Sequence, residues 1–260
     1  MNSFFLILGY NLKRVFTDIW AISLLLVIPL GLTVINGLFD DPASLNGYNV
    51  SASMNMPAFL LGFQFFKMGI LLHYLYNDLR GDMRWRLRAT PHSLLSFILP
   101  TFVAGWIISL VLGLIIVLIS VVFLDVYLGN LFIFAAVLLL VSLMANCLAM
   151  LLFLFTKKFS LANTLVYVIS FGLMILSGFM IPLGDSAIAD FLREHGTPLV
   201  LGARAIVYSG GLNDLPLFMD GSEIVTGPGI SQSLTNVGIL AAITAVIVAA
   251  TIIAAKVREI

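Results

Sequence analysis

Residues 94–123 read LLSFILPTFVAGWIISLVLGLIIVLISVVF, and no charged side chain interrupts them. A helix needs ~20 consecutive, mostly apolar residues to cross the ~30 Å hydrocarbon core of a bilayer. The apolar residues in this stretch are continuous and do not alternate with polar ones, which favours a helix over a strand of a membrane barrel. This stretch therefore predicts a transmembrane helix.

The composition extends this interpretation to the whole chain. Of 260 residues, 61% are hydrophobic and 10% are charged, with a mean hydropathy of +1.11, whereas soluble domains carry roughly 25% charged residues. The main solvent of such a chain is hydrocarbon. We predict a single all-α integral membrane domain over residues 1–260, with six transmembrane helices at 19–38, 56–76, 94–123, 131–155, 161–181 and 237–255.

Residues 1–18 have a different pattern from the spans that follow. On a helix, the apolar side chains at positions 4, 5, 8, 12, 15, 16 and 19 share one arc, and Lys13, Arg14, Thr17 and Asp18 lie opposite. This pattern predicts an amphipathic helix in the membrane interface, with Lys13 and Arg14 near the lipid headgroups. The alternative is that these residues extend the first span.

The basic residues are distributed unevenly between the two sides of the membrane. Six spans put both termini on one side, together with Lys13, Arg14, Arg80, Arg84, Arg86, Arg88, Lys157, Lys158, Lys256 and Arg258. The opposite side has Arg193 and Arg204, and Lys67 lies inside a span. The positive-inside rule therefore predicts a multi-pass protein of the plasma membrane with both termini in the cytoplasm. The net charge of zero gives no basis for nucleic-acid binding.

The longest polar stretch, residues 182–236, follows the fifth span and is expected outside the cell. Within it, residues 197–208 are apolar enough to dip into the membrane or to cap it as short re-entrant helices. Irregular backbone at that depth is tolerated where protein or a water-filled cavity surrounds it. Residues 221–232 are rich in Gly and Ser and are expected to form a loop.

The cytoplasmic loop 77–93 reads NDLRGDMRWRLRATPHS. Four arginines and Trp85 flank Gly81, and Pro91 stands where a helix commonly begins. Arg84, Leu87 and Arg88 have helical spacing, which predicts a short amphipathic helix parallel to the membrane. One explanation is that these arginines only bind anionic lipid and set the topology.

The order of these residues resembles the ABC-2 class of ATP-binding-cassette permeases. In that class an acidic residue ends the second span, and a glycine, a basic amphipathic stretch and a Thr/Ser-Pro pair follow. Here these are Asp78, Gly81, Arg84–Arg88 and Thr90-Pro91. The class more often has Glu-Arg where this chain has Asp78-Leu79, so that position agrees in charge alone.

Two further segments support the resemblance. The run Ser177-Gly178 with Pro182 looks like the small residues and proline that precede the external re-entrant helices of the family. The amphipathic helix over 1–18 is similar to its connecting helix. The resemblance covers essentially the whole chain.

This resemblance implies two permease subunits, identical or different, on two cytoplasmic ABC ATPases. The loop would be the element that couples permease to ATPase, through Asp78, Arg80, Gly81, Arg84, Trp85, Arg86, Arg88 and Pro91. A P-loop needs a Gly-Lys-Ser/Thr sequence, and none of the five lysines follows a glycine. ATP and Mg²⁺ are therefore expected on the partner ATPase, with no cofactor on this chain.

Three polar residues inside the predicted spans are candidates for the translocation path: Gln64, Lys67 and Asn146. A charged residue at mid-membrane costs about 2.5–3.5 kcal/mol on insertion scales, so Lys67 is expected in a bundle interior or a wet cavity. It could attract an anionic or hydrogen-bonding part of a substrate. It could equally make a structural hydrogen bond to a nearby carbonyl, or pair with a carboxylate of a partner chain.

The sequence shows no catalytic or metal-binding constellation, because the three histidines have no ligand spacing. We expect a non-catalytic permease that exports a hydrophobic or amphipathic compound such as a drug, antibiotic, peptide or lipid-linked molecule. The alternatives are an ATP-independent transporter or channel, and a membrane scaffold or immunity protein that binds a toxin.

Overall fold

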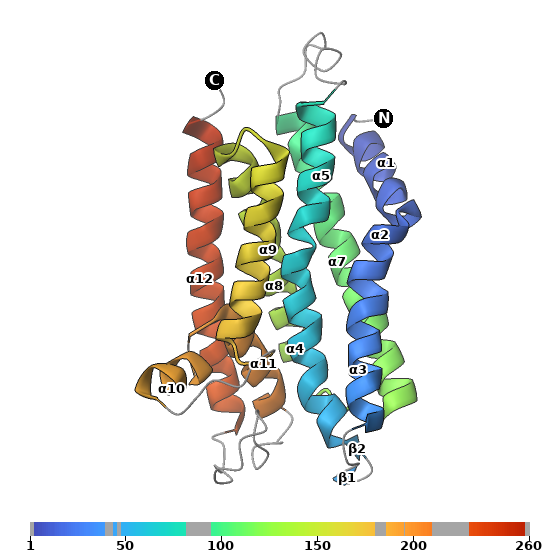
Figure 1. Ribbon diagram of the computed structural model, residues 1–260, viewed down its shortest axis with the longest axis vertical. Coiled ribbons are helices and arrows are strands. Elements are labelled where there is room, and N and C mark those ends of the chain that lie inside the picture. The colour runs from blue at the N-terminus through green and yellow to red at the C-terminus, as the bar shows by residue number, and fades with distance from the viewer. Residues whose placement is uncertain are drawn as a thin grey trace.

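The computed structural model describes residues 3–39, 44–45, 48–81, 95–179, 186–194, 196–209 and 229–257. Long helices run side by side along the longest axis of the molecule (Figure 1). The start of the first helix and the end of the last helix lie at the same end of the bundle. We call this the terminal end and the opposite one the distal end.

The chain forms helices almost throughout its described residues. In chain order they are α1 (Ser3–Thr17), α2 (Ile19–Ile22), the π-helix η1 (Ser23–Val27), α3 (Ile28–Phe39), α4 (Val50–Phe66), α5 (Met68–Leu79), α7 (Leu95–Leu124), α8 (Leu131–Phe155), α9 (Phe159–Leu176), α10 (Ala187–Glu194), α11 (Pro198–Ser209) and α12 (Gly229–Val257). Two short antiparallel strands, β1 (Ser44–Leu45) and β2 (Tyr48–Asn49), join α3 to α4.

Five helices of the described residues are long and apolar enough to cross a membrane. They are α4 with α5, α7, α8, α9 and α12. A sixth span results if Phe4–Thr17 and Ile19–Ile35, which meet at a bend of 72°, are counted together. The prediction of an all-helical membrane bundle is confirmed, with five to six candidate spans.

Three predicted helix boundaries differ from the structure by several residues. The second span starts at Val50 and not at 56. The fifth span ends at Leu176 and not near 181, because Gly178 has φ 76° and the amides of Gly178 and Phe179 donate to the carbonyls of Ile175 and Met174. The sixth starts at Gly229 and not at 237, because its polar first turns pack on α11. There the hydroxyl of Ser233 donates to the carbonyl of Ala205 (2.9 Å) and Asn236 is buried.

α11 is the short apolar helix expected over 197–208. Thr197 caps it by accepting a hydrogen bond from the amide of Val200 (3.2 Å), and most of its side chains are buried against α4, α8 and α12. Gly202 allows this close packing. A Cβ there would lie 2.9 Å from Leu61 on α4 and 2.9 Å from Val137 on α8.

Replacing Gly202 by valine tests this packing. The added side chain has no room between Leu61 and Val137, and overpacking of this kind costs about 1–3 kcal/mol. We expect Gly202→Val to lower the melting temperature of the purified protein in detergent. Gly238→Val is the matched control, since nothing lies within 4 Å of a Cβ at Gly238. Equal melting temperatures for the two variants would contradict the close approach of α11.

Candidate functional site

The end of α5 at the terminal end carries the first three residues of the predicted coupling element: Asp78 in its last turn, Arg80 at its C-cap and Gly81 just beyond. The structure describes the surroundings of all three. The other members, Arg84, Trp85, Arg86, Arg88 and Pro91, lie outside the described residues. The geometry of the site is therefore that of the point where the chain leaves the second span and enters the loop.

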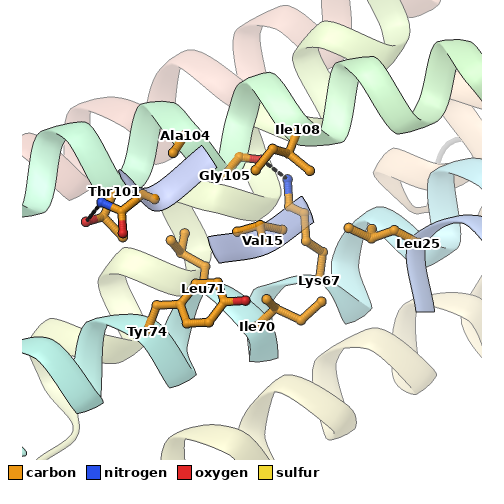
Figure 2. A pocket seen from close by; sticks show the side chains of 11 residues that line it. Val15, Leu25, Lys67, Ile70, Leu71, Tyr74, Thr101, Ala104, Gly105 and Ile108 are labelled. Atoms are coloured by element: carbon orange, nitrogen blue, oxygen red, sulfur yellow. Dashed lines mark hydrogen bonds between the residues drawn. The ribbon is translucent and has the colours of Figure 1, made fainter. Parts of the chain in front are cut away.

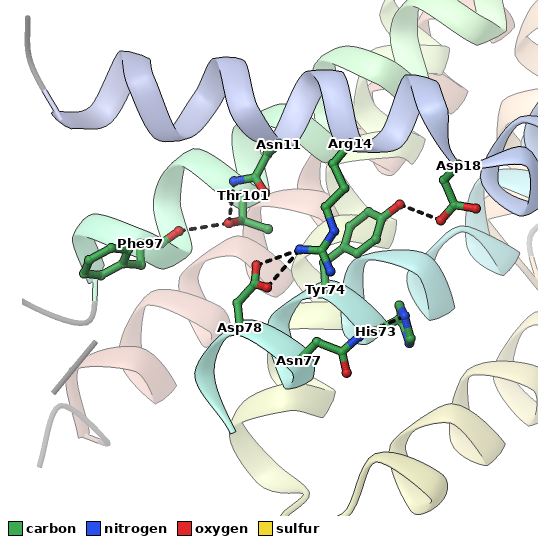
Figure 3. Close-up of polar contacts among 9 residues, drawn as sticks. All are labelled: Asn11, Arg14, Asp18, His73, Tyr74, Asn77, Asp78, Phe97 and Thr101. Atoms are coloured by element: carbon green, nitrogen blue, oxygen red, sulfur yellow. Dashed lines mark hydrogen bonds and ion pairs between the residues drawn. The ribbon is translucent and has the colours of Figure 1, made fainter. Parts of the chain in front are cut away.

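Asp78 faces α1. Nη1 of Arg14 donates to both carboxylate oxygens of Asp78, at 2.8 and 3.0 Å, and the two side chains are 25% and 37% exposed (Figure 3). The guanidinium of Arg14 also lies over the ring of Tyr74, 4.2 Å from its centroid. The Tyr74 hydroxyl donates to Asp18 (2.7 Å). Charge and aromatic contact thus hold α1 against the end of α5.

The same face of α1 makes two more polar contacts. The side-chain amide of Asn11 donates to the Thr101 hydroxyl on α7 (3.0 Å), as Figure 3 shows. Asp18 accepts hydrogen bonds from the amides of Trp20 and Ala21 (3.0 and 3.3 Å), so it caps α2 at the 72° bend. We call Asn11, Arg14, Asp18, Tyr74, Asp78 and Thr101 the polar network.

The orientation of α1 was not foreseen from its apolar arc. The polar side of α1 faces the bundle through Asn11 and Arg14. Apolar side chains are exposed at Phe5 and Phe16 on α1 and at Ile19 and Trp20 on α2. The spacing of Asn11, Arg14 and Asp18, three and four residues apart, contained the signal. A helix beside a membrane bundle can turn apolar residues toward lipid and polar residues toward protein.

Arg80 faces the opposite way, toward the end of α8. Its guanidinium donates to the carbonyls of Phe153 (2.9 Å) and Thr156, and it lies 4.5 and 4.8 Å from the ring centroids of Phe153 and Tyr76. The Tyr76 hydroxyl donates to the carbonyl of Thr156 (2.7 Å). Arg80 therefore satisfies carbonyls that the end of α8 leaves free, where a cation is also favoured by the helix dipole.

Gly81 ends the helix. Its amide donates to the carbonyl of Tyr76 (2.9 Å), and a Cβ at this position would lie 2.5 Å from the carbonyl oxygen of Asn77. A side chain cannot be accommodated at that distance without moving the backbone. The glycine predicted from the sequence is therefore required by close packing where the chain leaves α5.

Lys67 lies in the second span between α4 and α5, about two helical turns before Tyr74 of the polar network. It is 3% exposed, and its ammonium donates to the Ser109 hydroxyl and to the carbonyl of Gly105 (3.4 Å) on α7. A cavity of about 20 Å³ adjoins it, lined mainly by side chains of α1, α5 and α7 (Figure 2). The hydrogen bond to a neighbouring carbonyl is one of the three roles expected for this lysine.

Gln64 and Asn146 are also buried. The Oε1 atom of Gln64 and both polar atoms of the Asn146 side chain have no hydrogen-bond partner among the described residues. Asn146 and Lys67 approach the same residue, since a Cβ at Gly105 would lie 3.9 Å from Oδ1 of Asn146. Gln64 lies one helical turn before Lys67. The three candidate path residues therefore belong to the interior of one subunit.

Another face of the second span packs aromatic rings against α9 and is buried there at Phe66. Phe66 on α4 contacts Phe171 and Tyr167 on α9, with ring centroids 4.8 and 6.5 Å apart. Tyr167 and Phe171 are exposed. We call these three residues the aromatic face. Sequence analysis did not single them out, because aromatic residues are common throughout the spans.

The described residues contain no group of three or more His, Cys, Asp or Glu side chains that could hold a metal ion. The site instead connects the end of α5 to two neighbouring helices. One helical turn is joined to α1 by an ion pair and to α8 by charged hydrogen bonds.

Comparison with known proteins agrees with this architecture. No curated protein has significant similarity to the chain. The sequence model of the ABC-2 type transporter family matches residues 8–193, which extend from α1 through α10 and contain the polar network, Arg80, Lys67 and the aromatic face. This chain belongs to the ABC-2 type transporter family, and it is a membrane component of a transporter.

Proposed function

We propose that this chain is the permease subunit of an ATP-driven exporter, whose terminal end faces the cytoplasm and receives an ABC ATPase on residues 77–93. The observation that carries this proposal is the double attachment of the last turn of α5. Asp78 bonds to Arg14 on α1, and Arg80 bonds to the carbonyl end of α8. A displacement of the loop that follows Gly81 would therefore move three helices together.

The complete transporter of this proposal contains two permeases and two ATPases in the plasma membrane. The second permease is either another copy of this chain or a related chain. ATP and Mg²⁺ bind to the ATPase chains, since no lysine of this chain follows a glycine as a P-loop requires. The cargo is hydrophobic or amphipathic, in keeping with an apolar bundle that has few charges inside its spans.

Movement at the terminal end needs places where the helices can bend. Three irregularities lie near one another along the first two spans: the 72° bend at Asp18, the π-helix η1, and the interruption at Lys67. Leu25 of η1 and Lys67 line the same cavity. π-helical turns often occur at functional sites. We propose that α1 and α5 move as one unit about this level, because the polar network joins them.

The translocation path is proposed to follow the aromatic face, where Tyr167 and Phe171 are exposed to a partner subunit or to cargo and pack on the buried Phe66. Lys67, Gln64 and Asn146 are second candidates. They are enclosed by their own subunit, so they would join the path only when α1 or α7 moves away.

Copurification with a candidate ABC ATPase, followed by ATPase and transport assays, tests the function as a whole. We expect a stable complex in which cargo stimulates ATP hydrolysis. Transport by the purified chain alone in liposomes would instead favour an ATP-independent transporter. Protection against a toxin that persists when the ATPase is inactivated would favour an immunity protein.

Reversing the charge of Arg84, Arg86 and Arg88 to glutamate tests the coupling loop. If the loop docks on the ATPase, ATP hydrolysis should continue while cargo transport falls by about tenfold or more, equivalent to a coupling loss of ~1.4 kcal/mol. Lys157→Glu with Lys158→Glu is the matched control, because these exposed lysines lie at the same end but outside the loop. Equal losses in both variants would indicate that the arginines act only through anionic lipid.

Exchanging the charges of Arg14 and Asp78 tests the link between α1 and α5. Each single variant, Arg14→Asp or Asp78→Arg, places like charges side by side and should uncouple transport from ATP hydrolysis. The double variant restores opposite charges and should recover most of the transport per ATP. Partly exposed ion pairs contribute about 0–1 kcal/mol to stability, so melting temperatures should change little. Additive losses in the double variant would exclude a functional ion pair.

Replacing Lys67 by methionine tests its role at the interruption of the second span. Methionine keeps a similar length but cannot donate to Ser109 or Gly105. If Lys67 joins the path, Lys67→Met should change the transport rate or the range of cargo in the reconstituted transporter. Unchanged rate and cargo range would assign the lysine a structural role alone.

A further inference from the structure

α10 does not run along the longest axis of the molecule as the long helices do. It lies across the bundle near the distal end, at a steep angle to α9 and α12, and projects to one side (Figure 1). Its sequence, AIADFLRE, divides cleanly on a helical wheel. Ile188, Phe191 and Leu192 share one arc, and Asp190, Arg193 and Glu194 share the other. In the structure Ile188 is 75% exposed and Phe191 is 61% exposed.

The surroundings of α10 indicate what covers that apolar arc. The outer surface of α9, which leads toward α10, is also apolar and exposed at Val168, Ile175 and Leu176. In a membrane transport protein such a surface faces lipid. α10 continues it at the level where α9 ends (Figure 1). A short helix whose sequence divides into one apolar and one charged arc suits the boundary between acyl chains and headgroups.

α10 is also joined tightly to α11. The amide of Gly196 donates to the carbonyl of Leu192 (3.2 Å), and a Cβ at Gly196 would lie 2.5 Å from Cα of Leu192. Thr197 follows at once and caps α11, the helix that is buried among α4, α8 and α12. A turn with no room for a side chain leaves little freedom between the two helices, so the position of α10 influences the position of α11.

We propose that α10 is a membrane-interface anchor. Its Ile188–Phe191–Leu192 arc inserts among the acyl chains of the leaflet at the distal end, and this contact fixes the depth of α11 in the bundle. The partner is a lipid surface. The proposal requires only that the chain spans a membrane, and it stands whether or not an ATPase drives transport.

Spin labelling of the full chain in phosphatidylcholine vesicles tests the anchor. The chain has one native cysteine, Cys147, which is buried and is removed as Cys147→Ala. Ile188→Cys and Phe191→Cys place labels on the apolar arc, and Asp190→Cys is the matched control two residues away on the charged arc. Power saturation measures contact with oxygen, which concentrates in lipid, and with a water-soluble nickel complex.

We expect the labels at 188 and 191 to be mobile, accessible to oxygen and protected from nickel, and the label at 190 to show the reverse preference. Nickel accessibility at 188 and 191 equal to that at 190 would place α10 in water and overturn the proposal. Immobile labels shielded from both reagents would also overturn it, since a second copy of the chain would then cover the arc. If Cys147→Ala does not fold, the buried native cysteine is retained and a Cys147-only sample supplies the background.

Discussion

The structure depends on one constraint: a polar side chain surrounded by hydrocarbon has no water to bond and must find its partner within the protein. Arg14, Asp18 and Asn11 meet this constraint by facing α5 and α7. The apolar residues of α1 can then face outward, because lipid solvates them as well as a protein core would. α1 is thus attached to the bundle through polar bonds as well as through the buried Val15. This attachment places the ion pair at the end of α5 where it can transmit movement.

The sequence predicts the existence of the spans better than their surfaces. Long apolar runs specify helices at membrane length, and α7 and α8 begin and end within a residue of their expected limits. The same runs cannot distinguish a side chain that faces protein from one that faces lipid, since both are apolar. On α9, Val166 is buried and Val168 is exposed, although the two residues are identical in type. The predicted helix boundaries were wrong where tertiary contacts determine them, as at the first turns of α12, which α11 stabilises.

The candidate site was predictable in part for a similar reason. Asp78, Arg80 and Gly81 stand out because acidic, basic and glycine residues end a span in a recognisable order. Their partners do not stand out, because Arg14 and Phe153 lie 64 and 73 residues away along the chain. Lys67 was recognisable as a buried charge, but its choice of Gly105 and Ser109 depends on how α5 crosses α7. The order of residues along the chain identifies the candidate residues, and only the packing of the helices identifies their contact partners.

The two attachments of α5 differ in strength, which has a consequence for movement. The Arg14–Asp78 pair is partly exposed, and such pairs are worth about 0–1 kcal/mol. Arg80 donates charged hydrogen bonds to carbonyls at the end of a helix and lies against two aromatic rings, and charged hydrogen bonds contribute about 1.5–3 kcal/mol each. The ion pair is one of several contacts between α1 and α5, since Arg14 also lies over the ring of Tyr74 and the Tyr74 hydroxyl donates to Asp18. A movement that starts in the loop would therefore reach α8 through Arg80 and α1 through the whole polar network, and α1 and α5 both line the cavity beside Lys67.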